Sequence, residues 1–234
     1  MKIFIITPFP DVIDSFMNNS MIKKAIKKQV VTYEILDLFE YTNKLDHHID
    51  DYPFGGGDGM VMKPEPIFRA FDSIKTKIED STKVIYPTPD GRKFSQEEAK
   101  KFIKNKNLVF ICGHYKGVDQ RVRDNLITDE YSIGDYVITG GELSSLVIID
   151  SIVRLLPGVL NNIGSAKSDS FESDLLDCNY YTRPEIYRGL KVPKVLLSGH
   201  HQKIKEWKLE QKQIKTKDNR PDLWLKYKNK NDLE

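Results

Sequence analysis

The chain of 234 residues has only two cysteines, Cys112 and Cys178, and neither belongs to a CxxC motif or to a cluster with histidines. A disulfide framework and a tetrahedral zinc site both require more cysteines or histidines at close spacing. The shortage therefore argues against both, and it favours the reducing conditions of the cytoplasm. The adjacent pairs His47-His48 and Asp50-Asp51 lack a second cluster, so no metal ligands are predicted.

Long hydrophobic runs are also missing. No apolar run approaches the roughly 20 residues that a membrane-crossing helix needs. The apolar start of the chain runs into Pro8 and Pro10 without a small-residue cleavage site, so a signal peptide is not expected. With 39% apolar and 30% charged residues, the composition is that of a globular protein. We expect a soluble cytoplasmic protein that does not act at a membrane.

The common nucleotide-binding motifs are absent as well. The first apolar run ends in ITPFPD, with no glycine where a GxGxxG fingerprint would begin. The phosphate-binding motif GxxxxGK[ST] does not occur anywhere in the chain. Binding of ATP, GTP or NAD through these motifs is therefore not expected.

The sequence does contain a series of short, β-rich apolar runs, which are KIFIIT (2–7), VVTYEIL (30–36), KVIYP (83–87), LVFICG (108–113) and YVITG (136–140). Segments with helical spacing lie between them, at 12–27, 64–74, 96–104 and 142–155. Strands that alternate with helices predict an α/β fold with a mainly parallel sheet and helices on both faces.

The alternation stops near residue 160. We predict an α/β domain over 1–160 and a flexible linker over 161–176, where small and polar residues dominate. A small, mostly helical C-terminal domain is predicted over 177–234. Residues 201–234 contain ten Lys and Arg against six Asp and Glu, a local charge of +4. Basic side chains mixed with Trp207, Trp224 and Tyr227 suit a polyanionic partner, although charge alone favours a solvated helix face with aromatic core anchors.

Three of the predicted strand ends share a character that suggests a ligand site. They are YPTPDGR (86–92), CGHYKG (112–117) and SIGDYVITGG (132–141), all rich in glycine, proline or small polar residues. In open α/β sheets, ligands bind beyond the carboxyl ends of the strands. Short side chains leave backbone N–H and C=O groups free, which suits a flat heteroaromatic ligand. A tight turn without a ligand is the alternative at any one of these ends.

Five segments, in this order and spacing, carry a family resemblance: PFGGGDGMVMKPEPIF (53–68), YPTPDGR, FICGHYKGVDQRV (110–122), YSIGDYVITGGEL (131–143) and SDSFESDLLDCNYYTRPEIYRGLKVPKVLLSGHH (168–201). Together they resemble the bacterial tRNA (guanine37-N1)-methyltransferases, which are knotted, SPOUT-type RNA methyltransferases. The resemblance runs from Met1 to about Trp207. It implies a trefoil knot in the sheet domain and a homodimer with the active site at the subunit interface.

The implied reaction transfers the methyl group of S-adenosyl-L-methionine to N1 of guanosine 37 of tRNA, with no DNA substrate. By resemblance, Asp169 is the catalytic base and Arg154 stabilises the charge that develops on the guanine. The cofactor-binding residues implied in the same way are Tyr86, Thr88, Pro89, Gly113, Tyr115, Lys116, Ser132, Ile133, Gly134, Asp135, Tyr136, Val137, Ile138, Gly140 and Gly141. The resemblance also suggests a role for Mg²⁺, for which the sequence assigns no ligands.

Several positions depart from the family pattern, among them Gln120 in place of a common Glu and Ser144 in place of a usual proline. Lys116 stands where an acid is usual. The role of that acid in positioning the cofactor would then pass to Asp119, Asp135 or Glu142. Two alternatives therefore stay open beside methylation of tRNA: a related knotted methyltransferase that acts on another RNA, and an RNA-binding relative that has lost catalysis.

Overall fold

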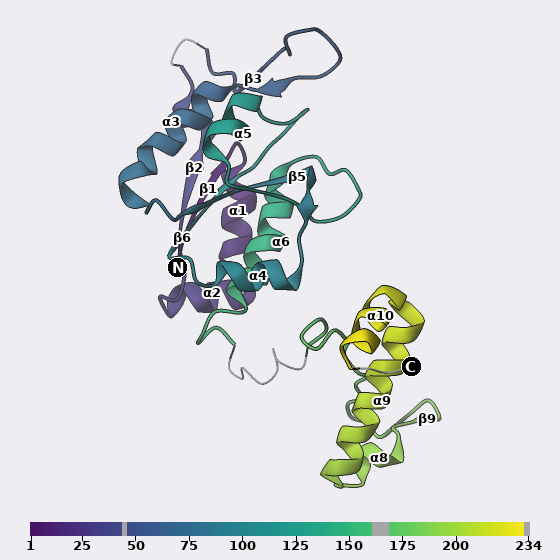
Figure 1. The fold of residues 1–234 in the computed structure, drawn as a ribbon. Coiled ribbons are helices and arrows are strands. Elements are labelled where there is room, and N and C mark those ends of the chain that lie inside the picture. The colour runs from purple at the N-terminus through teal and green to yellow at the C-terminus, as the bar shows by residue number, and fades with distance from the viewer. Residues whose placement is uncertain (44–45, 161–168, 232–234) are drawn as a thin grey trace. The chain divides into compact units, whose positions relative to one another are not determined.

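The structure is a computed structural model that describes residues 1–43, 46–160 and 169–231. The chain divides into two compact units, unit 1 (Met1–Asn161) and unit 2 (Asn162–Glu234) (Figure 1). The linker predicted over 161–176 begins at this division, and its residues 161–168 lie outside the described part of the chain.

Unit 1 is built on a five-stranded sheet in the order β2-β1-β6-β5-β7. The strands are β1 (Lys2–Thr7), β2 (Thr32–Asp37), β5 (Lys83–Lys93), β6 (Asn107–Ile111) and β7 (Asp129–Ser132). Every neighbouring pair in this sheet is parallel, which confirms the predicted sheet type. A short antiparallel pair, β3 (Asp50–Asp51) and β4 (Val61–Met62), forms a separate sheet.

The helices of unit 1 are α1 (Pro10–Met17), α2 (Ser20–Lys27), α3 (Pro64–Ile74), α4 (Gln96–Phe102), α5 (Gln120–Leu126) and α6 (Gly141–Val153), with 3₁₀ turns η1 (Leu38–Tyr41) and η2 (Lys75–Lys77). Their starts follow local sequence signals. Ser95 caps α4 by accepting a hydrogen bond from the Glu98 N–H, and Asp119 caps α5 by accepting one from the Arg121 N–H.

Successive side chains of the strands point to opposite faces of the sheet and belong to two hydrophobic cores, one on each face. Ile3 and Ile5 of β1 pack with residues of α1, α2, α4 and α6. Phe4 and Ile6 of the same strand pack with residues of α3 and α5. Because both faces are covered, the strands read as continuous apolar runs, and the prediction of helices on both faces is confirmed.

Two local predictions are wrong. Residues 136–140 do not form a strand, because β7 ends at Ser132 and an irregular segment follows as far as Gly140. The helix predicted over 12–27 is two helices, α1 and α2. Asn18 ends α1, and its side-chain amide donates to the carbonyl of Asp14 at 3.0 Å. Asparagine competes in this way with the helical backbone, so the break has a local cause.

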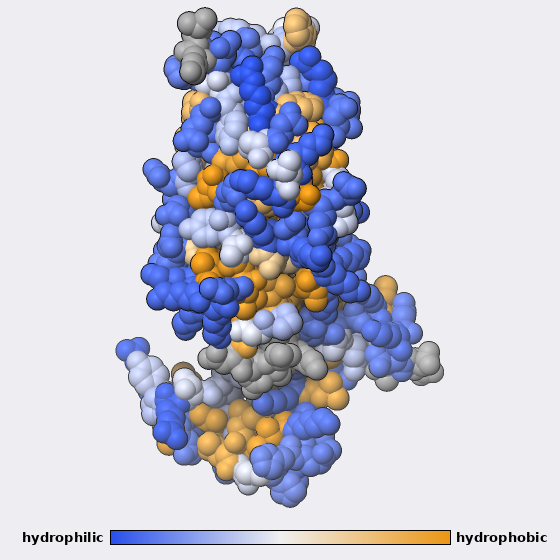
Figure 2. All heavy atoms as spheres, turned by 90° about the vertical axis from the view of Figure 1, so that its left-hand side faces the viewer, coloured by the Kyte–Doolittle hydropathy of each residue, from blue (hydrophilic) through white to orange (hydrophobic). Residues whose placement is uncertain are grey.

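Unit 2 contains the hairpin of β8 (Ile186–Tyr187) and β9 (Leu190–Lys191), followed by α8 (Lys194–Leu197), α9 (His201–Asn219) and α10 (Pro221–Lys230). It is mostly helical, as predicted. Pro221 stands at the first turn of α10, where a missing N–H costs nothing. On the face drawn in Figure 2, apolar side chains form patches between hydrophilic ones on both units.

Candidate functional site

A cavity of about 160 Å³ lies in unit 1 where β6 and β7 end and the pairing of β5 is interrupted. The register of β5 against β7 shifts between Pro87 and Arg92, which leaves Thr88 and Pro89 outside the ladder. The lining comes from all three segments that the sequence analysis singled out, 86–89, 113–117 and 131–141. The carboxyl edge of the sheet is where ligands bind in this fold class.

Most of the predicted cofactor residues lie together in this cavity. Its lining includes Tyr86, Thr88, Pro89, Gly113, Tyr115, Lys116, Ser132, Ile133, Gly134, Tyr136, Val137, Ile138, Gly140 and Gly141. Asp135 is absent from the lining, and its side chain is exposed. The structure adds six residues that the prediction did not include, which are Pro87, His114, Gly117, Tyr131, Thr139 and Ser144.

The segment 113–117 is held in place by backbone contacts with the start of β4. The N–H of Lys116 donates to the carbonyl of Met60 at 3.0 Å, and the N–H of Met62 donates to the carbonyl of Gly117 at 2.9 Å. Tyr115 adopts a φ of 60°, which a bulky residue takes up only under tertiary constraint. The stem of Lys116 lies against Gly59, since a Cβ on Gly59 would come within 2.9 Å of Lys116 Cε.

The glycine pair Gly140-Gly141 is needed for a close backbone approach. The N–H of Gly141 donates to the carbonyl of Gly113 at 2.8 Å. A Cβ on Gly141 would meet the Gly113 nitrogen at 2.7 Å, a contact that real Cβ atoms do not make. These glycines join the third lining segment to the second. They also open α6, whose N-cap is Gly140.

Tyr86 forms one wall and is almost fully buried. Its hydroxyl leaves no room at Gly113, where a Cβ would approach it to 2.8 Å. Burial raises the pKa of the Tyr86 phenol, which keeps it neutral. The Arg123 guanidinium lies 5.6 Å from the ring centroid and is itself held by Asp90 at 2.7 Å and Glu130 at 2.6 Å.

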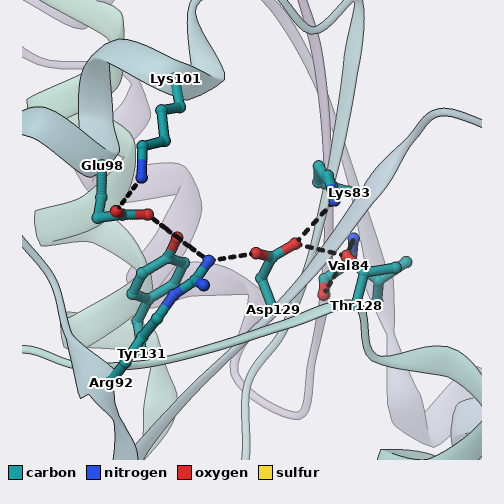
Figure 3. Close-up of polar contacts among 8 residues, drawn as sticks. All are labelled: Lys83, Val84, Arg92, Glu98, Lys101, Thr128, Asp129 and Tyr131. Atoms are coloured by element: carbon teal, nitrogen blue, oxygen red, sulfur yellow. Dashed lines mark hydrogen bonds and ion pairs between the residues drawn. The ribbon is translucent and has the colours of Figure 1, made fainter.

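A polar network supports the cavity at Tyr131 (Figure 3). Arg92 Nη2 donates to the Tyr131 hydroxyl and to Asp129 Oδ1, both at 2.6 Å. Its guanidinium also lies over the ring, 4.6 Å from the centroid. Tyr131 in turn donates to Glu98 of α4, while Lys83 lies 3.4 Å from Asp129. This network connects β5, α4 and β7, and burial raises the pKa of Tyr131.

Neither a reactive cysteine nor a cluster of metal ligands is found among the described residues. Cys112 is fully buried, and burial raises the pKa of its thiol, so it stays protonated and acts in packing. Within residues 1–43, 46–160 and 169–231, no three His, Cys, Asp or Glu side chains are grouped as metal ligands.

Of the two predicted catalytic residues, Arg154 lies away from the cavity lining within unit 1, and Asp169 belongs to the other unit. Arg154 is the C-cap of α6, whereas Gly141 at the cavity is the first residue of that helix. At 1.5 Å per residue, α6 separates them by roughly 20 Å within one chain. Asp169 belongs to unit 2, where its carbonyl accepts from the Glu172 N–H at 3.4 Å.

The sequence model of the family described as "tRNA (Guanine-1)-methyltransferase TrmD" matches residues 1–226. The chain belongs to this family. It is 48% identical over 228 residues to the tRNA (guanine-N(1)-)-methyltransferase of Listeria monocytogenes serovar 1/2a, covering 97% of this chain and 93% of the relative. The protein of the same name from Anoxybacillus flavithermus is 47% identical over 227 residues, with the same coverage. That from Bacillus cereus is 47% identical over 223 residues, 95% of this chain and 91% of the relative.

The match to the tRNA (guanine-1)-methyltransferase family covers the whole of unit 1 and most of unit 2. Membership makes the chain an enzyme that uses a methyl donor. The cavity at the carboxyl edge of the sheet is the candidate site for that donor. Among the described residues, no helix is both long enough and apolar enough to span a membrane.

Proposed function

We propose that this protein transfers the methyl group of S-adenosyl-L-methionine to N1 of guanosine 37 of tRNA, beside the anticodon, in the cytoplasm. The observation that carries the proposal is the convergence of three glycine-rich segments on one cavity in a chain that belongs to this family. RNA is the proposed substrate, to the exclusion of DNA.

The cavity suits S-adenosyl-L-methionine by the chemistry of its lining. Ile133, Ile138 and Pro89 offer apolar walls for the adenine. Backbone N–H groups of the glycine segments can donate to its ring nitrogens, and backbone C=O groups can accept from its amino group. Mixed apolar walls with a few polar groups are typical of cofactor sites. The bound donor supplies an electrophilic methyl group on a positively charged sulfur.

The chain must then make guanine N1 a nucleophile, because N1 carries a proton at neutral pH. We assign Asp169 as the general base that accepts this proton. Arg154 can donate to guanine O6 and N7 together, so that its positive charge stabilises the negative charge left on the base. Asp119 and Asp135 contribute no side chain to the cavity lining, so neither is assigned a role there.

The position of Arg154 supports a homodimer. One chain holds Arg154 roughly a helix length from its own cavity, as the rise of α6 requires. Leu143, Val147, Asp150 and Arg154 recur every three or four residues and so share one face of α6. Two copies of α6 packed antiparallel about Val147 would bring Arg154 of the partner subunit to the Gly140-Gly141 turn.

The surface of this face is suited to such packing. Leu143 is 57% exposed and Val147 48% exposed, although most other residues of α6 are buried. On the neighbouring α1, Val12 and Phe16 are exposed too, as is Phe9 just before it. Apolar side chains in a contiguous exposed set mark interaction surfaces. A second copy of the chain is the occupant we propose, with the active site formed at the interface.

Unit 2 is the proposed tRNA-binding domain. Between His201 and Glu234 the chain carries a local charge of +4, with ten basic and six acidic residues. Lysines along α9 and α10 can neutralise phosphates of the RNA backbone, and this contribution weakens as salt rises.

The test is methyl incorporation from labelled S-adenosyl-L-methionine into two tRNA transcripts, one with guanosine and one with adenosine at position 37. Label only in the guanosine transcript is the expected result. Label in both transcripts would point to another target nucleotide. Label in neither, with RNA binding retained, would identify a relative that has lost catalysis.

A further inference from the structure

Glu142 is a carboxylate that the fold buries at the edge of the cavity. Its exposed fraction is 4%, and it stands in the first turn of α6. Burying a charge is unfavourable unless hydrogen bonds satisfy it. Both oxygens are satisfied, since the Thr7 hydroxyl donates to Oε1 at 2.6 Å and His114 Nε2 lies 2.6 Å from Oε2. The helix N-terminus favours negative charge at this position as well.

The two partners of Glu142 come from different parts of the sheet. Thr7 is the last residue of β1, and His114 follows β6. The Thr7 hydroxyl also accepts from the N–H of Phe9 at 3.0 Å. The His114 ring packs edge-on against the Phe9 ring, with 4.8 Å between centroids. One carboxylate therefore connects the end of β1, the segment after β6 and the start of α6.

This arrangement explains why Gly140 lacks a side chain. A Cβ on Gly140 would lie 2.1 Å from His114 Cε1 and 2.7 Å from Glu142 Oε2. Gly140 and His114 also form an isolated antiparallel bridge. Gly140 and His114 both line the cavity, whereas Glu142 lies behind them.

We propose that Glu142 is a positioning residue for the methyl donor. Acting through His114 and Gly140, its carboxylate holds two lining segments of the cavity in register with the end of β1. Glu142 itself does not touch the donor. The inference rests on the proposed function, since it concerns the donor site of the same reaction.

The experiment compares wild-type protein with Glu142→Gln and Thr7→Val by calorimetry with S-adenosyl-L-methionine, by thermal melting, and by steady-state kinetics with tRNA. Thr7→Val is near the shape of threonine and leaves Oε1 without its donor, so we expect the Kd and KM for the donor to rise about tenfold. Glu142→Gln keeps an acceptor for Thr7 and should be affected less. The KM for tRNA should stay within about twofold.

Glu34→Gln is the matched control. It removes a carboxylate of the same unit that is bonded to Lys2 at 2.8 Å and Lys77 at 2.6 Å, on strand β2. It should lower the melting temperature without changing the Kd for the donor. If Thr7→Val and Glu142→Gln behave like this control, Glu142 serves stability alone and the positioning role is overturned.

A double-mutant cycle tests whether Glu142 acts on the donor site through the contact between His114 and Gly140. Gly140→Ala should abolish donor binding because its Cβ meets the His114 ring, and adding His114→Ala should restore part of that binding. Strictly additive effects of the two substitutions on donor binding would overturn the proposal that Glu142 acts through this contact. Calorimetry on the wild-type protein distinguishes failure of the proposed function from failure of the positioning role. A wild-type protein that does not bind the donor overturns the proposed function, and this inference with it.

Discussion

The two units of the chain achieve their shapes by different physical means. Unit 1 has an apolar core on each face of its sheet, and most side chains of β1 and β6, together with Val84, Ile85 and Tyr86 of β5, are buried in one or the other. In the described part of unit 2, the buried residues are Asp174, Leu175, Cys178 and Thr216. Two of these four are polar. The cores of unit 1 are therefore close-packed and apolar, whereas the smaller buried set in the described part of unit 2 is half polar.

The polar contacts of unit 2 connect residues 174–177 with the last two helices. Asp174 pairs with Lys226 at 2.8 Å and Lys230 at 3.0 Å, and Asp177 pairs with Lys212 at 3.0 Å. Contacts that include exposed lysines are weakened by salt and by competing phosphates. Unit 1 is thus the more rigid of the two, as the proposed donor site requires, and unit 2 is the more adjustable, as the proposed RNA contact requires.

The largest effect should come from Asp169→Asn in unit 2. An amide cannot accept the N1 proton, so we expect turnover to fall by roughly 10²–10⁴-fold, the usual contribution of a general base. The Kd for S-adenosyl-L-methionine should not change, because the cavity lies in unit 1. Single-turnover methylation and calorimetry measure the two quantities.

Asp218→Asn is the control for this variant, since Asp218 is an exposed acid on α9 of the same unit. It should methylate at the wild-type rate. Near-normal turnover by Asp169→Asn would remove Asp169 as the base.

The next effect concerns the exposed face of α6. Val147→Asp should dissociate the proposed homodimer, because it would bury an unpaired carboxylate at the centre of an apolar contact. Turnover should be lost with the dimer, since each cavity would lack Arg154 of the partner subunit. Sedimentation measures the assembly state. Phe39→Asp alters an apolar side chain of the same unit that is also exposed, 43% against 48%, and should remain dimeric. A dimeric Val147→Asp protein would mean that another surface holds the copies together.

The sequence predicted the scaffold of unit 1 well, because strand and helix patterns are local. β1 and α3 match their predicted bounds, and the three strand ends converge as the parallel topology requires. The strand predicted over 136–140 is wrong because the bulky apolar residues of this irregular segment resemble a strand, although Val137 is 86% exposed. Tertiary contacts could not be predicted from local sequence patterns, because residues such as Thr7 and Glu142 are separated by 135 positions in the chain. The same holds for the network around Tyr131.

A smaller effect is expected on the stability of unit 2 when the pH is lowered. The Lys226 and Lys230 ammonium groups hold the pKa of Asp174 below its usual range. A lowered folded pKa contributes stability that is fully present above the unfolded value of about 3.9 and is lost as pH falls through the folded value. Both tryptophans, Trp207 and Trp224, lie in unit 2, so tryptophan fluorescence follows this unit alone.

Asp174→Asn should remove this acid dependence and destabilise unit 2 by roughly 1–2 kcal/mol at neutral pH, a value reduced by the exposure of the two lysines. Glu210→Gln, at an exposed acid of α9 in the same unit, should leave the transition unchanged. An acid transition that is the same in wild type and Asp174→Asn would show that apolar packing, after all, holds unit 2 together.

The smallest effect should come from Lys116, the lysine of the cavity lining. Its stem lies along Gly59, so Lys116→Met keeps the packing and removes only the charge, while Lys116→Glu reverses it. The donor carries a positive sulfur, and a partly exposed charge pair contributes at most about 1 kcal/mol, so Lys116→Glu should tighten donor binding by about fivefold. Lys116→Met should fall between the two, and raising the salt concentration should bring all three affinities together. Equal affinities at low salt would mean that the charge at this position does not reach the donor, and that the rigid packing of unit 1 alone determines how tightly the donor binds.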